Sequence, residues 1–201
     1  MSIRKKILAI SIGPVLVLGV ITLLFMLTMV KSSLMDEVQD ALKGTAAATL
    51  AAYDQNTGDY LESTNGDIWK GSYNISKSEN LVDRIKENTG MDVTFFYGNK
   101  RIMTSALDKK GNRILGSEAG ERVVNQVIKG KKPFFSTNVS LDGTRNYGYF
   151  IPVYQNGTTD QVIGMVFVGT NKARKDAIVN KILGSIMMAL LVVMFLCIVT
   201  A

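Results

Sequence analysis

The sequence predicts an α+β domain held between two membrane-spanning helices. Two runs, residues 7–30 and 182–201, contain no charged residue. The segment between them, residues 31–181, holds all 17 acidic residues and 20 of the 23 basic ones. Within this segment the apolar residues recur first with a helical period and then with the alternation of strands. These observations exclude a single soluble globule, and the mixed composition excludes a disordered chain.

The counts of histidine and cysteine exclude several kinds of site. The chain has no histidine, and its one cysteine, Cys197, lies in the second apolar run. An intramolecular disulfide, a catalytic triad with histidine and a zinc site of the HExxH type are therefore excluded. Carboxylate catalysis would need a recognisable pair of acids, and the sequence shows none. We predict no enzymatic activity, no catalytic residue, no metal and no cofactor.

The basic residues in excess lie at the flanks of the apolar runs. The net charge is +6, and the sequence pI is about 9.4. Residues 31–181 carry +3, and −1 once the four basic residues nearest the second run are left out. Such flanks suit anionic lipid headgroups, so we expect membrane lipid and no nucleic acid as a partner. The flanking residues are Arg4, Lys5, Lys6, Lys172, Arg174, Lys175 and Lys181.

Residues 7–30 are long enough to form a first transmembrane helix. As a helix they would extend about 36 Å, against a hydrocarbon core of about 30 Å. The alternative is a cleavable signal peptide, whose apolar region is usually shorter, roughly 7–15 residues, and ends at small residues. This run ends in Leu27-Thr28-Met29-Val30 before Lys31. An uncleaved anchor is therefore favoured.

The charges also predict an orientation. Basic residues before the first run place residues 1–6 in the cytoplasm, so residues 31–181 face outside and residues 182–201 return through the membrane. Four basic residues on the outer side of the second helix oppose this. A folded domain of this length translocates largely regardless of charge, so they weigh less. We predict a multi-pass protein of the cell membrane with an extracytoplasmic domain.

The first part of the middle segment, residues 31–89, reads as helical. No proline interrupts residues 31–53, so the helix is expected to continue from the first span. It either covers the sheet of its own domain or also pairs with its copy in a homodimer, and both interpretations stay open. Its stripe of mostly small residues, spaced by three and four, is Leu34, Val38, Ala41, Thr45, Ala48 and Ala52, with Met35, Leu42 and Thr49 alongside.

A loop and a short helix are expected next. Residues 54–78 are polar and read as irregular, although their aromatic residues must pack against something. The sequence from Ser76 to Glu79 fits a capping box that opens a helix, and Gly90 stands where a helix usually ends.

The remainder, residues 91–169, reads as a sheet. Gly98-Asn99, Asp142-Gly143 and Asn156-Gly157 mark hairpin turns. A helix opened by Ser117 and ended by Gly130 interrupts the strands. Five antiparallel strands with helices on one side make an α+β domain of PAS-like type. The expected strands are residues 92–97, 101–107, 134–141, 145–154 and 161–169.

Three stretches resemble a known sensor family. Residues 91–105, MDVTFFYGNKRIMTS, form a hairpin that ends in Arg-x-x-Thr. Residues 112–116, NRILG, form a turn, followed by Ser117 where threonine is usual. Residues 147–154 and 161–169 are similar to closing strands. With the span, sensor, span layout, these stretches resemble the N-terminal part of a bacterial methyl-accepting chemotaxis protein with a single Cache sensor domain.

The resemblance implies a receptor for a small solute that signals through the second membrane helix. Such receptors continue with a HAMP linker and a methylated coiled coil, so a cytoplasmic kinase and adaptor would be reached only through a region after residue 201. Similar modules also feed histidine kinases and cyclic-dinucleotide enzymes. A membrane-anchored binding protein without output, and an ectoenzyme, are the remaining alternatives.

The resemblance also implies a ligand site between the sheet and the membrane-distal loop. Aromatic walls and a few directed polar groups suit such a pocket. Arg101 could hold a carboxylate through two hydrogen bonds, which favours a small organic acid or an amino acid as ligand. The alternatives are that the aromatic residues are core and that Arg101 is solvated. The candidate residues are Trp69, Phe96, Tyr97, Arg101, Thr104, Tyr147 and Tyr149.

Overall fold

The structure, a computed structural model, describes residues 3–200. Predictions for Met1, Ser2 and Ala201 lie outside the described residues, as do the side chains of Arg4, Lys5, Lys6 and Cys197. The chain divides into two compact units. One contains Val38–Ala173, and the other contains Met1–Glu37 with Arg174–Ala201.

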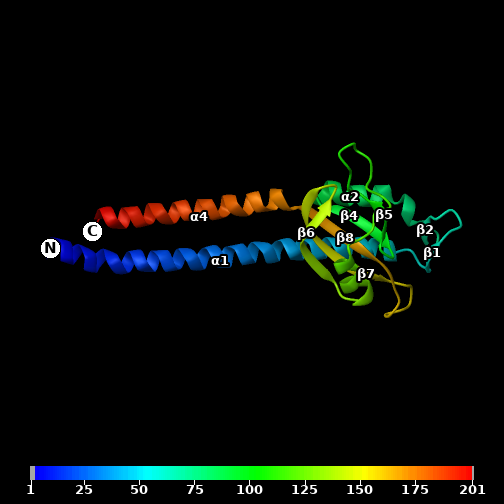
Figure 1. Ribbon diagram of the computed structural model, residues 1–201, viewed down its shortest axis with the longest axis horizontal. Helices are drawn as coiled ribbons and strands as arrows, with labels where there is room; N and C mark the ends of the chain where they lie inside the picture. Colours follow the sequence, from blue (N-terminus) through cyan, green and yellow to red (C-terminus); the bar gives the residue numbers. More distant parts are fainter. Residues whose placement is uncertain (1–2, 201) are drawn as a thin grey trace. The chain divides into compact units, whose positions relative to one another are not determined.

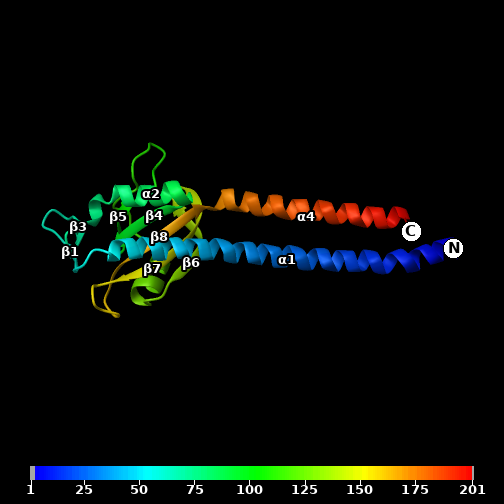
Figure 2. The same cartoon turned by 180° about the vertical axis from the view of Figure 1, so that it is seen from behind.

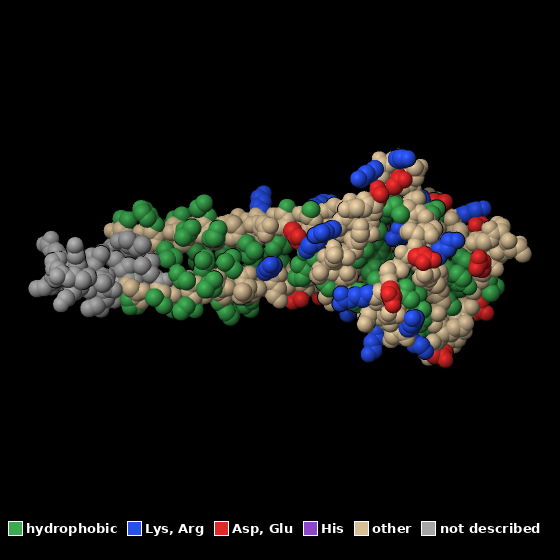
Figure 3. All heavy atoms as spheres, in the orientation of Figure 1, with side chains coloured by type: hydrophobic (Ala, Val, Ile, Leu, Met, Phe, Trp, Pro, Cys, Tyr) green, Lys and Arg blue, Asp and Glu red, His purple; other side chains and the backbone are tan. Residues whose placement is uncertain are grey.

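The unit at the chain ends consists of two helical segments. Helix α1 (Ile3–Asp54) is continuous, which confirms that the first span and the following helical segment form one helix. Helix α4 (Lys172–Thr200) follows the last strand. Both helices are long and apolar enough to cross a membrane. Figure 3 shows mainly apolar side chains along the part of these helices that is not grey. Phe25 and Phe195, for example, are 65% and 64% exposed. Exposed apolar surface of this kind suits a lipid environment.

The Val38–Ala173 unit is built on a five-stranded antiparallel sheet (Figure 1). The strand order is β5-β4-β8-β7-β6. This confirms the predicted α+β fold with five antiparallel strands and a long N-terminal helix. The strands are β4 (Asp92–Tyr97), β5 (Lys100–Thr104), β6 (Phe134–Leu141), β7 (Thr144–Tyr154) and β8 (Val162–Asn171).

The C-terminal part of α1 crosses one face of this sheet, as Figure 2 shows for β7 and β8. Its buried residues are spaced by three and four, as a helix on a sheet requires. They share Val38, Leu42 and Thr49 with the predicted residues, but the face is turned from the centre of the stripe, because Ala48 is exposed whereas Ala46 is fully buried. The buried face consists of Val38, Leu42, Ala46, Thr49 and Tyr53.

Aromatic packing joins α1 to the sheet. Phe95 of β4 contacts Tyr53 of α1, with ring centroids 5.1 Å apart, and stacks on Tyr60 at 5.8 Å. All three side chains are at most 1% exposed. The Tyr53 hydroxyl forms a buried 2.9 Å hydrogen bond with Ser78 Oγ. The rings on this face are closely packed, and the buried hydroxyls of Tyr53 and Ser78 are paired.

The segment predicted as irregular forms a second small sheet. Strands β1 (Tyr60–Glu62), β2 (Ile68–Lys70) and β3 (Tyr73–Asn74) pair in that order. The prediction was wrong because strands of two or three residues leave little periodicity to detect. Their packing comes from Tyr60 and Ile68, which are buried although the intervening turn is polar.

The helices after this sheet differ in part from expectation. A 3-10 turn η1 (Ile75–Lys77) precedes α2 (Glu79–Thr89), and Gly90 ends α2 in the left-handed conformation, as predicted. The capping box is not formed. Ser76 Oγ instead accepts a hydrogen bond from the Ile68 amide, and Ser78 Oγ donates to the Ile75 carbonyl. Both hydroxyls therefore bond to neighbouring segments instead of capping α2.

The helix predicted from Ser117 is shorter and irregular. It comprises α3 (Glu121–Val123) and the π-helical turn η2 (Val124–Lys129). Ser117 does not cap it, because Gly120 is the N-cap residue of α3. The Ser117 carbonyl instead accepts a 2.9 Å hydrogen bond from the Arg101 amide. The residues before α3 thus pair with the edge of β5. This pairing builds one wall of the cavity described next.

Candidate functional site

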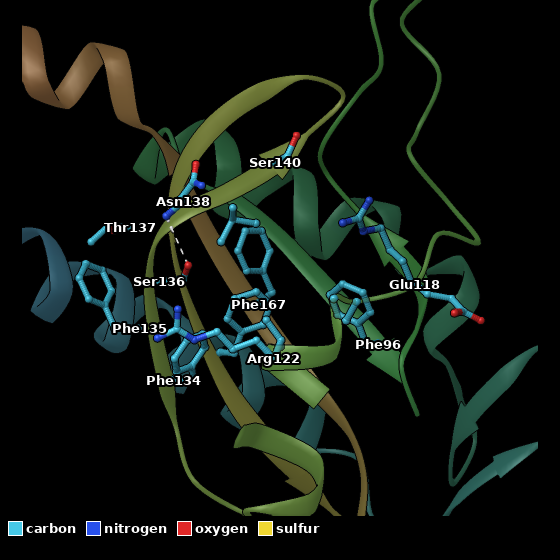
Figure 4. Close-up of a pocket in the computed structure, with 16 residues that line it drawn as sticks. Phe96, Glu118, Arg122, Phe134, Phe135, Ser136, Thr137, Asn138, Ser140 and Phe167 are labelled. Atoms are coloured by element: carbon cyan, nitrogen blue, oxygen red, sulfur yellow. Dashed lines mark hydrogen bonds between the residues drawn. The ribbon is translucent and has the colours of Figure 1, made fainter. Parts of the chain in front are cut away.

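A cavity of about 520 Å³ lies on the face of the sheet opposite α1 (Figure 4). Neighbouring residues on a strand point to opposite faces, so Phe96 lines the cavity while Phe95 packs on α1. Cavities of this size bind small ligands. The lining residues are Phe96, Arg101, Glu118, Ala119, Gly120, Arg122, Val123, Phe134, Phe135, Ser136, Thr137, Asn138, Val139, Ser140, Phe150 and Phe167.

The floor of the cavity is aromatic. Phe96, Phe150 and Phe167 come from three adjacent strands, β4, β7 and β8, and each is at most 3% exposed. The rings of Phe150 and Phe167 lie 4.7 Å apart between centroids, and Phe134 lies 6.4 Å from Phe150. The sheet therefore offers an apolar surface to the body of a ligand.

A bulge in β5 brings Arg101 to the cavity. Phe95 pairs with Met103 but Phe96 pairs with Arg101, so Ile102 is the extra residue. The guanidinium carbon of Arg101 lies 5.3 Å from the centre of the Phe96 ring. This bulge places a cation at the edge of the aromatic floor.

Arg101 is buried without an acidic partner at hydrogen-bonding distance among the described residues. It is 8% exposed, its Nη1 donates a 3.3 Å hydrogen bond to the Ile114 carbonyl, and its buried Nε has no partner in the described part of the chain. Burial lowers the pKa of Arg101, and the charge of Asp92 opposes that shift. A guanidinium in this setting is stabilised by a bound anion.

Two further charged residues lie in the wall. The guanidinium carbon of Arg122 is 5.3 Å from the centre of the Phe134 ring, and Glu118 lies beside Ala119 in the segment that pairs with β5. Figure 4 shows Glu118 and Arg122 on opposite sides of Phe167 in that view. Both are exposed. With Arg101 they give the lining a formal charge of +1, which favours an anion.

The rim formed by β6 is polar. The register between β6 and β7 shifts between Ser136 and Val139, so Thr137 and Asn138 form a bulge. The Asn138 amide donates to Ser136 Oγ at 3.3 Å. Hydroxyl and amide groups therefore line the cavity beside the aromatic floor, where they can position the polar part of a ligand.

Comparison with known proteins identifies the family. The sequence matches the family described as single Cache domain 3 over residues 73–182, more than half of the chain. The chain belongs to this family. No curated protein matches the sequence.

Two solved structures are similar to this Cache protein. One is an extracellular ligand binding receptor from Desulfohalobium retbaense DSM5692, with a TM-score of 0.53 and 14% identity, covering 76% of this chain and 26% of that one. The other is described as methyl-accepting chemotaxis protein X, with a TM-score of 0.48 and 16% identity, covering 78% of this chain and 65% of that one. This chain thus spans about a quarter of the first relative's length. The first likeness shows that the fold is shared.

The structure brings two of the seven predicted site residues of the Cache domain to the cavity, namely Phe96 and Arg101. Thr104 is fully buried and hydrogen-bonded to Thr94 at 2.7 Å. Tyr97, at the end of β4, is half-buried and is not among the lining residues. A ligand role for these residues stays a prediction.

The other three predicted residues lie elsewhere in the Cache domain. Side chains alternate between the two faces along β7, so Tyr147 and Tyr149 point away from the cavity side, where Phe150 lies. They therefore belong to the face that α1 covers. Tyr147 accepts a 2.6 Å hydrogen bond from Lys172 Nζ. Trp69 is half-buried in the small sheet, opposite Leu61.

Sequence reasoning did not select most residues of the cavity, notably Arg122, Phe134, Phe150 and Phe167. The register between β7 and β8 would have been a usable guide, because it makes Phe150 and Phe167 direct partners. A predicted register between these strands would have placed both rings on the face of Phe96. The glycines Gly148 and Gly169 beside them were a second signal, because glycine inside a strand often marks close packing.

Proposed function

We propose that this protein is an extracytoplasmic sensor that binds a small organic anion in the cavity and transmits its occupancy through α4. The buried guanidinium of Arg101, which no acidic side chain pairs among the described residues, carries this proposal. A carboxylate bound there would form charge-assisted hydrogen bonds, and the aromatic floor would receive its apolar body. The Cache family and the receptor-like fold support a role in sensing.

The proposed action is binding without catalysis. Glu118 is the one acidic residue among the described residues of the lining, whereas carboxylate-based hydrolysis commonly uses two. The exposed position of Glu118 could suit the ammonium group of an amino acid. Amino acids are therefore the second ligand class to test.

The binding test uses the full chain in detergent micelles. Isothermal titration calorimetry is run with acetate, butyrate, succinate, glycine and L-alanine as probes. We expect at least one acid to bind, and Arg101→Met to weaken its binding roughly 10- to 100-fold, as expected for hydrogen bonds to a charged group.

Lys100→Met is the matched control. It removes one positive charge from the adjacent residue, which is exposed and is not among the lining residues. We expect it to leave binding unchanged. Equal losses in the two variants would show that general charge and not the cavity holds the anion, and binding of none of the probes would contradict the proposed ligand classes.

The proposed topology places residues 31–181 outside the cytoplasm, between membrane helices at 7–30 and 182–201. The two long apolar helices support membrane anchoring. Protease added to intact cells should cleave within the segment around Trp69. The N-terminal fragment is detected with an antibody against an N-terminal tag. Protection of this segment, or loss of the tag before protease treatment, would contradict the topology.

Transmission is proposed to pass from β8 to α4. Strand β8 ends at Asn171 and α4 begins at Lys172, with no residue between them. A displacement of the sheet on binding would therefore act on α4 directly, provided that the ligand favours one arrangement of the sheet. The output, whether chemotaxis control, a histidine kinase or a cyclic-dinucleotide enzyme, depends on what α4 is connected to.

A homodimer paired through α1 is also proposed. The outer face of this helix within the Val38–Ala173 unit carries Gly44, Ala47, Ala48 and Ala51, all exposed. Small exposed residues allow two helices to approach closely. Ala48→Arg should convert the dimer to a monomer in light scattering, whereas Lys43→Arg should not. A wild-type monomer would contradict the proposal.

A further inference from the structure

The floor of the cavity contains a pair of glycines that the ring of Phe167 covers. Gly148 on β7 and Gly169 on β8 are direct partners in the sheet. A Cβ on Gly169 would lie 2.4 Å from Cζ of Phe167, and one on Gly148 would lie 2.5 Å from its Cε2. Both distances are far below van der Waals contact. The ring therefore occupies the space where both side chains would begin.

The ring, and not the backbone, makes glycine necessary here. Neither Gly148 nor Gly169 has a positive φ, so alanine would meet no backbone strain at either position. At Gly169 the three nearest neighbours of the added Cβ are all atoms of the Phe167 ring. At Gly148 the Cγ2 of Val139 also lies within 2.8 Å. Gly169 is thus the cleaner position for a test.

A displaced Phe167 ring has open space on its cavity side. Its centroid lies 4.7 Å from that of Phe150, which closes one side, and the strands lie beneath it. Phe167 also lines the cavity, where space is unfilled. An alanine at Gly169 would therefore raise the ring into the cavity and make it shallower, because a packed sheet yields less readily than a side chain beside a void.

The position of Phe167 relates this geometry to a ligand. In Figure 4 the Phe167 side chain is seen between Phe96 and Phe134. Arg101 stacks on Phe96 at one end of this aromatic row. A ligand whose charge is held at Arg101 can therefore lay its apolar body over Phe167.

We infer that the Gly148–Gly169 pair, with the Phe167 ring lying over it, determines the longest apolar body that the cavity accepts. The inference rests on the proposed function and adds a size limit to the ligand class, a short-chain organic acid. Each methylene that the cavity can bury strengthens binding about fourfold, and the first one that meets the ring gains nothing.

The experiment measures how affinity depends on chain length in the full chain in detergent micelles. The probes are the straight-chain acids from acetate to hexanoate, and calorimetry is run on the wild type, Gly169→Ala, Phe167→Ala and the double variant. Arg101→Met corrects for partition into micelles. Gly44→Ala is the matched control, because Gly44 of α1 is not among the lining residues and a Cβ there meets no neighbouring atom within 4 Å.

In the wild type, affinity should rise with chain length to an optimum and then fall. Gly169→Ala should shift the optimum by at least one carbon toward shorter acids, and Phe167→Ala toward longer ones. The double variant should follow Phe167→Ala, because the added Cβ then has no ring to displace. Gly44→Ala should keep the wild-type optimum. The same optimum in Gly169→Ala and wild type would overturn the inference.

A second measurement keeps the inference testable in two other cases. If Phe167→Ala does not fold, the shift of the optimum in Gly169→Ala relative to Gly44→Ala decides. If no acid binds any variant, the proposed function fails, and xenon binding followed by xenon NMR measures the apolar space instead. Gly169→Ala should then bind less xenon than Gly44→Ala, and equal binding would overturn the inference.

Discussion

The two faces of the sheet use their aromatic side chains differently. On the α1 face, Phe95 is enclosed by Tyr53 and Tyr60, and the Tyr60 hydroxyl donates to Asp54 at 3.2 Å. On the other face, Phe96 and Phe167 border a cavity. Rings of equal burial therefore meet protein atoms on one face and unfilled space on the other.

Polar groups follow the same division. The buried hydroxyls of Tyr53 and Ser78 bond to each other, whereas Nε of Arg101 has no partner in the described part of the chain. Buried polar groups are usually satisfied, so an exception indicates a role outside folding. The α1 face thus contributes to stability through paired groups, whereas the proposed ligand would contact the unpaired groups and rings of the cavity face.

The largest expected effect is a difference in stability between variants at two neighbouring residues of β4, one on each face of the sheet. Phe95→Ala should reduce the free energy of unfolding by about 3–5 kcal/mol, because it leaves a void between closely packed rings. Phe96→Ala should cost about 1–2 kcal/mol, because a ring beside a void loses fewer contacts. Trp69, the one tryptophan of the chain, reports urea unfolding of this unit by fluorescence.

The same two substitutions should have the opposite order of effect on ligand binding. Phe96→Ala should weaken the binding of any acid that the wild type binds, whereas Phe95→Ala should leave it unchanged under conditions where the variant is folded. Equal destabilisation by both substitutions would contradict the division between the two faces.

A second prediction tests the α1 face by pH. Burial, and then the charge of Asp54, raise the pKa of Tyr60 above its ordinary value of 10. The native state therefore keeps this proton where the unfolded chain loses it, so stability should be full below pH 10 and fall above it by about 1.4 kcal/mol per pH unit. Urea unfolding between pH 8 and 11 measures this slope.

Tyr60→Phe should remove this contribution to the slope. Tyr154→Phe is the control, because Tyr154 is half-buried at the end of β7 and its hydroxyl bonds to the exposed Lys131. If stability falls with pH as steeply in Tyr60→Phe as in the wild type, Tyr60 does not titrate as the packing of this face requires.

Turn chemistry made much of the sheet predictable from the sequence. Gly98 and Gly143 have positive φ angles of 56° and 77°, and both were predicted as turn residues from local sequence alone. Gly90, at 68°, ends α2 as expected. These positions are local, because a left-handed backbone favours glycine whatever surrounds it.

The choice between faces was not predictable in the same way. Alternation indicated that Tyr147 and Tyr149 share a face, but not that Phe150 lies on the cavity side. That assignment depends on the register of β7 with β8, where Phe150 pairs with Phe167, and this is a non-local property. The bulge that brings Arg101 opposite Phe96 is likewise invisible to a period-two pattern.

A third prediction tests the cavity face without a ligand. Arg101→Met should raise the free energy of unfolding by about 1 kcal/mol, because it replaces a desolvated charge by an apolar chain of similar length. Lys100→Met should change it by less than about 0.5 kcal/mol, as at most exposed sites. Urea unfolding of both variants measures the difference. A clear loss of stability in Arg101→Met would show that the guanidinium contributes to folding, against the proposed role.

The smallest expected effect lies where the α1 face meets α4. Lys172 Nζ donates to the Tyr147 hydroxyl at 2.6 Å and lies 4.1 Å from the centre of its ring. Tyr147 in turn stacks on Phe135, a lining residue of the cavity, with centroids 6.3 Å apart. Since the contact is one of several that fix this strand, Lys172→Met should change stability by less than about 1 kcal/mol.

Its effect should instead appear in hydrogen exchange. Lys172→Met should leave acid binding unchanged but reduce the ligand-dependent change in amide protection in the first turns of α4, because it removes the side-chain link between the cavity wall and that helix. Lys175→Met, in the same helix, is the control and should keep the change. If both variants respond to ligand like the wild type, the contact between Lys172 and Tyr147 has no part in transmission.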